Sequence, residues 1–462
     1  MLKFIKNHKN SNFIIQENGE VIKYKSFIEY NEELKNFKLD KNCLFFLENS
    51  FTVEFIAVLI FLLSKKNCAI LIFDKQISDE NFINLIKSYK PYYIISLQKI
   101  LLRDYKIVHK FKKLNFFQSR FKTKYKINLD LKLLLATSGS TGSIKYVRCT
   151  LKNIIANSLA IKKYLKLNKK SITITTLSFN YVYGLSVLIT HLISGGSIIL
   201  TNKNILEKKF WKIVKKYNCN NLNFVPYSYE LLDKINKLKS LLNLNLNFMT
   251  SAGDALNEYM IEKISNLNKK KIPFYRMYGQ AEATSRIAYV PPKHFSLVDC
   301  IGIPVPGGKI FQKGNKKVSE LFYKGKNVSL GYSKSYKDLK KKDINKGIIA
   351  TGDIGYKGKN KLYFLVNRKK RYVKIYGINF NLDDFEKKYF ANYNLRIYVI
   401  RGIKPNSITI FFQKKINRKR IINFFINNYR IHYTNIKLKK IKKIPLTYSG
   451  KISYKELEKY ND

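Results

Sequence analysis

A loop rich in hydroxyl groups and glycine is the segment of the sequence best suited to bind a polyphosphate. Its residues are Thr137, Ser138, Gly139, Ser140, Thr141, Gly142, Ser143, Ile144 and Lys145. Glycine lets backbone N–H groups approach a ligand closely, the hydroxyl groups supply further donors, and the lysine adds a positive charge. The loop is not the P-loop of nucleotide-binding ATPases, which has four residues between its glycines and Lys-Ser/Thr directly after the second.

The segments on either side indicate how this loop is held. An apolar run, Leu133–Ala136, precedes it, and apolar residues at helical spacing extend from Leu151 to Leu159. The pattern predicts a strand that enters the loop and a helix to which the loop leads. On its own such a loop is more often a plain turn with Lys145 in solvent, so its interpretation depends on the rest of the chain.

Four later segments, taken in order with this loop, carry a family resemblance. They are Met249–Leu256 (MTSAGDAL), Tyr278–Glu282 (YGQAE), Thr351–Asp353 (TGD) with Arg368, Lys374 and Gly377 after it, and Pro445–Lys451 (PLTYSGK). The set resembles the motifs of the adenylate-forming superfamily, which includes acyl-CoA synthetases, carrier-protein ligases, nonribosomal adenylation domains and luciferases. The five motifs span residues 133–457, and weaker similarity covers nearly the whole chain.

The resemblance implies a reaction in two steps. A carboxylate attacks the α-phosphorus of ATP, pyrophosphate leaves, and the acyl-AMP then passes its acyl group to the thiol of CoA or of a carrier-protein phosphopantetheine. Lys451 is the expected catalytic cation, since negative charge gathers on the phosphate oxygens. Lys374, beside Gly377, is the second expected catalytic residue and faces the acyl-adenylate after the small domain swings about Lys370.

The same resemblance implies a set of ATP-binding residues: Thr137, Ser138, Gly139, Ser140, Thr141, Gly142, Lys145, Gly253, Asp254, Tyr278, Gln280, Asp353 and Arg368. Tyr278 would stack on adenine, and the backbone near Gly253 and Asp254 would read the edge of the base. Asp353 would accept hydrogen bonds from both ribose hydroxyls, because a carboxylate takes two donors at once. Arg368 would support the ribose or a phosphate.

Glu282 is the expected ligand of Mg²⁺, a hard cation that prefers carboxylate, water and phosphate oxygens. The motif around it departs from the family, with Ala281 where threonine is typical. The lost hydroxyl predicts a lower rate rather than a different reaction. The loop also has Ile144 and Tyr146 in place of proline and glycine, and Asn367 replaces the glycine before the arginine.

The acid is less well defined than the reaction. The segment Phe179–Leu185 falls where the superfamily lines its acyl pocket, and Asn180 stands where amino-acid-activating relatives place an aspartate. A buried ammonium without a counter-charge is costly, which favours an acid without an α-amine. The segment Gly253–Leu256, however, looks more like the corresponding segment of the superfamily members that activate amino acids. An amino-acid:carrier-protein ligase, for example for alanine, and a degenerate polyanion-binding or scaffold protein remain alternatives.

Short apolar runs alternate with amphipathic stretches through the first half of the chain. Strands are expected at Cys43–Leu47, Cys68–Phe73, Tyr92–Ile95, Ile172–Thr176, Ser197–Leu200 and Leu222–Val225, and helices at Val53–Leu63, Phe82–Ile86 and Leu185–Leu192. This alternation predicts an α/β fold with layers of parallel strands and helices. We expect a large N-terminal α/β-layered domain of several subdomains over residues 1–367 and a small, mobile C-terminal α/β lid over residues 368–462.

Composition excludes some functions. The chain has 462 residues, 45% of them hydrophobic, which is too apolar for a disordered protein. Its 87 Lys and Arg against 31 Asp and Glu give a net charge of +56. Because lysine outnumbers arginine and is dispersed, we attribute the charge to coding bias and expect no specific nucleic-acid partner. The expected partners are a small carboxylic acid and an acidic acyl-carrier protein.

The longest apolar run, Phe55–Leu63, is too short to cross a bilayer, and the N-terminus has no secretion signal. We therefore expect a cytoplasmic protein. The five cysteines lie far apart without a CxxC pair, which predicts reduced, mostly buried thiols. The five histidines show no metal-ligand spacing, and no Ser-His-Asp or Cys-His arrangement is present.

Overall fold

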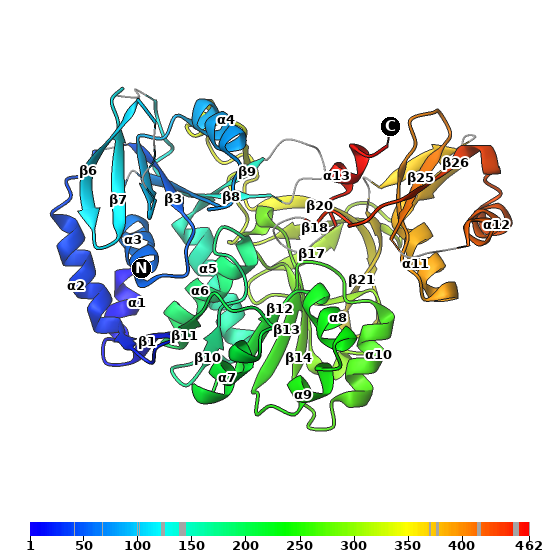
Figure 1. Cartoon of the computed structure of the whole chain (residues 1–462), viewed down its shortest axis with the longest axis horizontal. Helices are drawn as coiled ribbons and strands as arrows, with labels where there is room; N and C mark the ends of the chain where they lie inside the picture. The colour runs from blue at the N-terminus through cyan, green and yellow to red at the C-terminus, as the bar shows by residue number, and fades with distance from the viewer. Residues whose placement is uncertain are drawn as a thin grey trace. The chain divides into compact units, whose positions relative to one another are not determined.

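The computed structural model describes residues 1–40, 42–66, 68–98, 100, 102–121, 125–137, 145–368, 371–375, 378–413, 417–446 and 452–461. These residues form two compact units (Figure 1). The larger unit takes in residues 1–137, 145–310 and 323–349, and the smaller one residues 311–322 and 350–461. The domain boundary at residue 367 stays a prediction.

The larger unit contains two sheets built mainly from parallel strands. In the first, the strand order is β16-β15-β14-β13-β12-β10-β11-β1-β2, and the six strands from β14 to β1 are parallel. The strands are β1 (Asn12–Gln16), β2 (Val21–Lys23), β10 (Ile172–Ile174), β11 (Ser197–Leu200), β12 (Asn221–Phe224), β13 (Phe248–Ala252), β14 (Phe274–Tyr278), β15 (Ala288–Val290) and β16 (Cys300–Pro304).

The second sheet of the larger unit has the order β19-β9-β8-β4-β3-β5-β7-β6. Its four central strands, β8, β4, β3 and β5, are parallel, and its outer strands pair antiparallel. The strands are β3 (Cys43–Glu48), β4 (Cys68–Phe73), β5 (Tyr93–Ser96), β6 (Tyr105–Phe111), β7 (Leu114–Ser119), β8 (Leu131–Ala136), β9 (Tyr146–Thr150) and β19 (Tyr332–Ser333).

Helices cover both faces of both sheets. One apolar core joins side chains of α2, α3, α5 and α6 to strands of both sheets, so these helices lie between the sheets. A second core packs α7 to α10 on the other face of the first sheet, and a third packs α4 on the other face of the second. These helices are α2 (Tyr24–Lys35), α3 (Val53–Ser64), α4 (Asp79–Tyr89), α5 (Leu151–Leu165), α6 (Val182–Ser194), α7 (Lys208–Lys216), α8 (Pro226–Lys234), α9 (Leu238–Leu242) and α10 (Glu258–Leu267).

This layering explains why β3 and β4 are apolar along their whole length. A strand covered by helices on both faces has no polar side, and all residues of both strands are buried. The predicted α/β fold is confirmed, and each strand and helix expected in the first half is present, with ends shifted by at most three residues.

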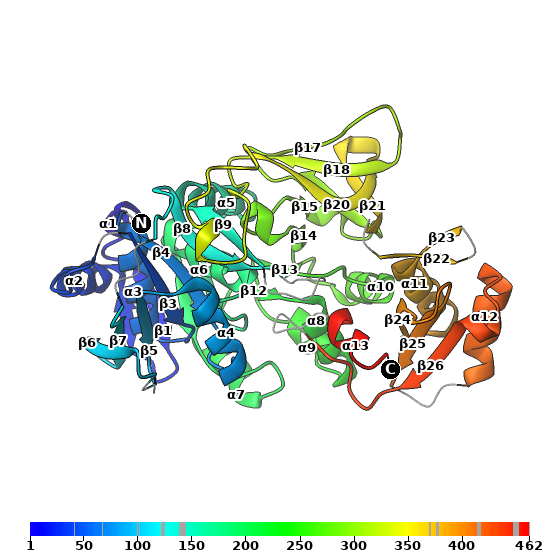
Figure 2. The same ribbon diagram turned by 90° about the horizontal axis from the view of Figure 1, so that it is seen from above.

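The smaller unit contains four strands in the order β17-β18-β20-β21, a hairpin of β22 and β23, and a three-stranded sheet of β24 to β26. Helices α11 and α12 pack on one face of that sheet and α13 on the other (Figure 2). The bounds are β17 (Lys309–Gln312), β18 (Ser319–Lys324), β20 (Ile348–Lys357), β21 (Tyr363–Arg368), β22 (Tyr372–Ile375), β23 (Ile378–Asn381), α11 (Leu382–Tyr393), β24 (Tyr398–Arg401), β25 (Ile408–Phe412), α12 (Arg418–Tyr429), β26 (Ile436–Lys440) and α13 (Tyr454–Glu458).

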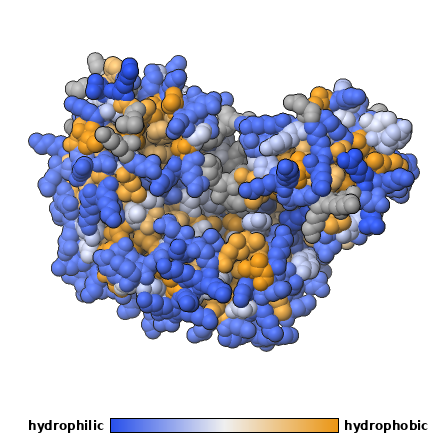
Figure 3. Space-filling model, in the orientation of Figure 1, coloured by the Kyte–Doolittle hydropathy of each residue, from blue (hydrophilic) through white to orange (hydrophobic). Residues whose placement is uncertain are grey.

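Surface and thiol properties agree with the composition. Hydrophilic residues dominate the face shown in Figure 3, with apolar residues in separate patches.

Among the described helices, none has both the length and the apolar character that a membrane crossing requires. All five cysteines are free and buried, as predicted, and burial raises the pKa of Cys43, Cys149 and Cys219 to about 12.

Candidate functional site

The hydroxyl-rich loop joins two antiparallel strands. Thr137, after β8, donates from its backbone N–H and from Oγ1 to the carbonyl of Lys145, at 3.0 and 2.9 Å, and β9 begins at the next residue. The helix expected from Leu151 onward is present as α5, which begins where the Thr150 side chain and Asn153 form a capping box. The strand β9 between the loop and this helix was not predicted. Residues 138–144 lie outside the described part of the chain.

A tight turn between β14 and β15 carries Glu282. Gly279 starts the turn, and a Cβ there would lie 1.8 Å from the carbonyl oxygen of Ser285, so only glycine fits. Thr284 and Ser285 have φ angles of 56° and 133°, which are rare for residues other than glycine. Ala281, where the family has threonine, is buried in the core between the sheets.

Tyr332 holds the side chain of Glu282. Its hydroxyl donates to Oε1 of Glu282 at 2.6 Å, and the backbone N–H of Ser329 donates to the Glu282 carbonyl at 2.9 Å. Burial, together with the carboxylate, raises the pKa of Tyr332, so the phenol remains a donor across the physiological range. Oε2 of Glu282 accepts no hydrogen bond from a described residue.

The strand that leaves the loop passes beside this turn. Tyr332 pairs with Val147 of β9, two residues beyond Lys145, and Thr284 Oγ1 lies 3.8 Å from the sulfur of Cys149. The larger unit thus places Glu282 next to the strand that carries the basic end of the loop. Cys149 is not a candidate nucleophile, since its raised pKa keeps the thiol protonated.

The expected adenine-binding residues lie at the ends of neighbouring parallel strands. β13 pairs with β14, with Ala252 opposite Met277, so Gly253 and Tyr278 end adjacent strands. Gly253 has a φ of 101°, and Asp254 is exposed with Oδ1 accepting from the backbone of Ala255 at 2.8 Å. Tyr278 is half-buried, and Gln280 accepts from the backbone of Ala283 through its carbonyl. Ligands in open α/β sheets bind at such carboxyl ends.

The smaller unit brings together the two residues expected at the ribose. Asp353 on β20 lies opposite Arg368 on β21 in the strand register. Asp353 is buried, and its backbone N–H donates to Oγ1 of Thr351 at 3.2 Å. Lys374 lies on β22 opposite Asn379 of β23. Gly377, Lys370 and Lys451 lie outside the described residues, as do Ser138, Gly139, Ser140, Thr141 and Gly142.

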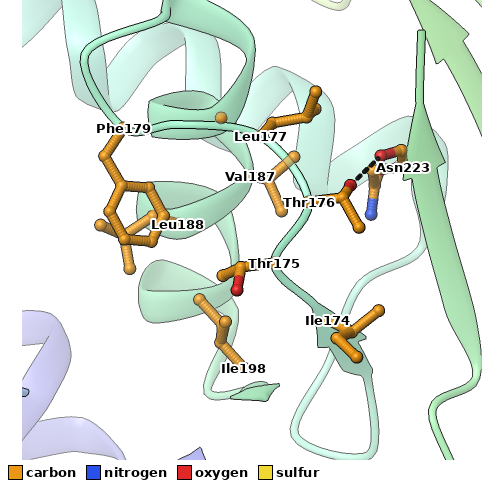
Figure 4. A pocket seen from close by; sticks show the side chains of 10 residues that line it. Ile174, Thr175, Thr176, Leu177, Phe179, Val187, Leu188, Ile198 and Asn223 are labelled. Carbon is orange, nitrogen blue, oxygen red and sulfur yellow. Dashed lines mark hydrogen bonds between the residues drawn. The ribbon is translucent and has the colours of Figure 1, made fainter. Parts of the chain in front are cut away.

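The expected acyl-pocket segment surrounds the start of α6. A pocket there is shown in Figure 4, and its polar wall includes Thr176, whose hydroxyl donates to the carbonyl of Asn223 at 3.2 Å. Phe179 stacks on Phe55 with ring centroids 5.6 Å apart. The full lining is Ile174, Thr175, Thr176, Leu177, Phe179, Gly184, Val187, Leu188, Ile198 and Asn223.

Two groups of residues near these segments were missed from the sequence. Asn180 donates to Oδ2 of Asp74 at 3.2 Å, which brings a carboxylate to the position where the superfamily members that activate amino acids have their aspartate. Arg286, four residues after Glu282, is buried against Tyr183. The signal for Arg286 was a cation directly before an apolar run, whereas nothing in the sequence linked Asp74 to Asn180.

In the smaller unit, the acidic segment after β23 is more than a helix cap. Asn381 is the N-cap of α11, and the half-buried Glu386 accepts from Arg371 at 2.7 Å and from the Tyr454 hydroxyl at 2.5 Å. Glu386 therefore does more than cap the helix. At the start of α13, the Ser453 side chain accepts from the backbone of Glu456 at 3.3 Å.

The residues at the turn fit Mg²⁺. This ion is held by one or two carboxylates together with phosphate oxygens and water, and the half-buried Glu282 offers one such carboxylate. In the described chain, no cluster of three or more His, Cys, Asp or Glu forms an all-protein metal site. When bound, the ion would neutralise charge on the phosphates of the nucleotide.

Comparisons with known proteins show similarity to adenylate-forming enzymes. Residues 109–333 match the family AMP-binding enzyme. Luciferin 4-monooxygenase of Nipponoluciola cruciata is 27% identical over 324 residues, covering 66% of this chain and 57% of that protein. The 2-succinylbenzoate–CoA ligase of Staphylococcus epidermidis is 23% identical over 396 residues, covering 83% and 81%. The chain thus spans less than two thirds of the luciferin 4-monooxygenase.

Solved structures share the fold over the full chain. ATP-bound MatB from Rhodopseudomonas palustris has a TM-score of 0.80 at 16% identity, covering 99% of both chains. O-succinylbenzoate CoA synthetase from Bacillus subtilis, in complex with AMP, has a TM-score of 0.77 at 14% identity, covering 98% of both. The fold is that of the adenylate-forming enzymes. The predicted resemblance is confirmed: residues 109–333 match the AMP-binding enzyme family, and the structure has the fold of the adenylate-forming enzymes.

Proposed function

We propose that the protein activates a carboxylic acid with ATP, forming an acyl-adenylate and pyrophosphate, and then transfers the acyl group to a thiol. The observation that carries this proposal is the placement of Glu282 beside β9. Tyr332 pairs with β9 and holds the carboxylate, so the side chain that we propose as the Mg²⁺ ligand lies next to the strand that follows the hydroxyl-rich loop. A nucleotide triphosphate bound by that loop would meet a cation at Glu282.

The other residues take roles around the same nucleotide. Gly253 and Asp254 would border adenine, and Tyr278 would stack on it. Asp353, which lies opposite Arg368 in the pairing of β20 with β21, would accept hydrogen bonds from the ribose hydroxyls. Lys451 would stabilise the charge that develops on the α-phosphate, which preorganised cations do most effectively in a site shielded from water.

Transfer to the thiol is the second half of the proposal. Lys374 on β22 would face the acyl-adenylate after a swing of the smaller domain about Lys370, and the acceptor would be CoA or a carrier-protein phosphopantetheine. Relatives named as CoA ligases, including those for 2-succinylbenzoate and oxalate, support CoA as the first acceptor to test.

An amino-acid ligase is the second candidate. The carboxylate of Asp74, 3.2 Å from the Asn180 amide, would offer a counter-charge for a substrate ammonium. One experiment distinguishes the carboxylic-acid ligase from the amino-acid ligase. The protein is incubated with ATP, Mg²⁺ and one acid at a time, and the AMP and pyrophosphate formed are measured. The acids are short, long and aromatic carboxylic acids and D- and L-alanine. Turnover with acids lacking an amine supports the first candidate, turnover with alanine supports the second, and no turnover with any acid contradicts both.

A further inference from the structure

A buried arginine lies behind the Glu282 turn. Arg286 is only 3% exposed, and its guanidinium carbon lies 4.2 Å from the ring centre of Tyr183, itself 1% exposed. Nη1 donates to Oγ of Ser285 at 2.5 Å and to the Ser285 carbonyl at 3.4 Å, and the Tyr164 hydroxyl is a further hydrogen-bond partner of the guanidinium. Nε has no hydrogen-bond partner, and no described acidic side chain forms an ion pair with this guanidinium. A buried cation in that condition is costly unless a ligand supplies the missing acceptors.

Arg148 shows what a purely structural buried arginine looks like in this protein. It is fully buried, but its guanidinium donates to the backbone carbonyls of Leu330 at 2.7 Å and of Tyr332 and Lys342, each at 3.2 Å, and it also bonds to Lys341. All three of its nitrogen atoms are therefore engaged. Arg286 has the same burial without this set of acceptors, so burial alone does not account for its presence.

The surroundings of Arg286 connect it to the acyl pocket. The hydroxyl of Tyr183 is 2.6 Å from Oγ1 of Thr250, which donates to Oδ1 of Asn223 at 2.8 Å, and Asn223 lines the pocket. Asn157 donates to the carbonyl of Arg286 at 3.0 Å, while its own Oδ1 is buried without a partner. Arg286 is thus linked through Tyr183, Thr250 and Asn223 to the wall of an apolar pocket, and the buried Asn157 beside it has unused hydrogen-bonding capacity.

We propose that Arg286 selects the acid by binding a second carboxylate on it, which makes a dicarboxylic acid the substrate class. This inference rests on the proposed function, since it concerns the acid that would be adenylated. The guanidinium fork matches a carboxylate with two donors, and the ion pair would supply the counter-charge that the protein lacks here. The same positive charge would repel a substrate ammonium, so amino acids such as alanine are disfavoured.

The test compares acids of equal chain length that differ only in the second carboxylate. Pyrophosphate release is measured with succinate, glutarate and adipate and with butyrate, valerate and hexanoate. We expect kcat/KM of the wild-type protein to be at least about tenfold higher for the best diacid than for its matched monoacid. Arg286→Met should abolish this preference, and Arg286→Lys, which keeps the charge without the fork, should retain part of it.

Arg148→Met is the matched control, because it removes an equally buried guanidinium that contacts only backbone. It should lower the melting temperature and leave the diacid-to-monoacid ratio unchanged. A wild-type preference for monoacids, or an equal loss with both acids in Arg286→Met, would overturn the proposal and give Arg286 a structural role.

A binding measurement separates this inference from the proposed function. The melting temperature is recorded with each diacid in the absence of ATP. If no acid releases pyrophosphate but a diacid stabilises the wild-type protein and not Arg286→Met, the anion site stands and the proposed activity fails. Absence of any diacid-dependent stabilisation together with absence of turnover overturns both.

Discussion

The hydroxyl of Tyr332 donates a hydrogen bond of 2.6 Å to Oε1 of Glu282. The two residues are 50 positions apart, and the bond joins the turn after β14 to the short strand β19. It leaves Oε2 of the carboxylate without a described protein partner. The pair is therefore arranged to hold one carboxylate oxygen in place while the other is available to a cation.

Tyr332→Phe tests this arrangement. Loss of one hydrogen bond to a charged group weakens the placement of the carboxylate by about 1.5–3 kcal/mol, so we expect the Mg²⁺ concentration for half-maximal activity to rise about tenfold. The measurement is a magnesium titration of acid-dependent pyrophosphate release. Tyr336→Phe, in the larger unit but without a contact to Glu282, should leave the titration unchanged. An unaltered magnesium requirement in Tyr332→Phe would argue against Glu282 as the ligand.

Asp353→Ala tests the expected ribose contact. The Asp353 carboxylate is expected to accept two hydrogen bonds from the ribose of ATP. Loss of both bonds should lower the affinity for ATP by about tenfold or more. Equilibrium binding of ATP measured by calorimetry gives the comparison directly. Asp343→Asn, which changes an aspartate that bonds only to neighbouring backbone in its loop, serves as control. Unchanged ATP affinity in Asp353→Ala would refute the assignment.

The half-buried cluster of the smaller unit makes a prediction about stability. Arg371 pairs with Asp383 at 2.8 Å and Glu386 at 2.7 Å, and its guanidinium carbon lies 3.5 Å from the ring centre of Tyr454. Arg371→Met leaves the half-buried carboxylates of Asp383 and Glu386 without a counter-charge, which should cost about 1–3 kcal/mol. Urea unfolding measures this loss.

Lys388→Met is the control for that measurement. It removes an exposed pair with Asp384, 3.3 Å apart, which contributes at most about 0.5 kcal/mol. Equal effects of Arg371→Met and Lys388→Met would mean that the half-buried cluster contributes nothing beyond a surface pair.

His191 predicts a dependence of stability on pH. Burial lowers its pKa to about 4, while an unfolded histidine titrates near 6.5. A lowered folded pKa means that stability is fully present above the unfolded value and falls as the pH drops from about 6.5 towards 4. Linkage gives a loss of about 2 kcal/mol between pH 7 and pH 5.

Urea unfolding of the wild-type protein and of His191→Gln at these two pH values measures that loss. The variant should lose less stability on acidification, whereas His432→Gln, which changes an exposed histidine, should behave like the wild-type protein. The same pH dependence in His191→Gln and wild type would exclude His191 as its source.

Most of the fold could be predicted from the sequence because its strands are covered on both faces. β4 and β11 have the predicted ends, since a fully buried parallel strand is an uninterrupted apolar run between turn residues. The helix after the hydroxyl-rich loop begins at Leu151 as expected, but β9 before it was missed because this strand is only five residues long, contains Arg148 and has no apolar run to reveal it.

The site was predictable only where a motif is local. Glu282 and Gly279 could be identified because a tight turn fixes residues near in sequence. Tyr332 and Arg286 could not, since their roles come from contacts across strands. A polar side chain on a strand looks the same in the sequence whether it faces water or fills a buried site, and burial decides between the two.

The proposed reaction joins the carboxylate of an acid to the α-phosphate of ATP. The most direct measurement supplies the active acid with both carboxylate oxygens labelled with ¹⁸O, together with ATP and CoA, and examines the products by mass spectrometry. We predict one ¹⁸O atom in AMP, none in pyrophosphate, and no labelled AMP with Lys451→Ala. Unlabelled AMP, or label in inorganic phosphate with ADP as the product, would contradict the claim.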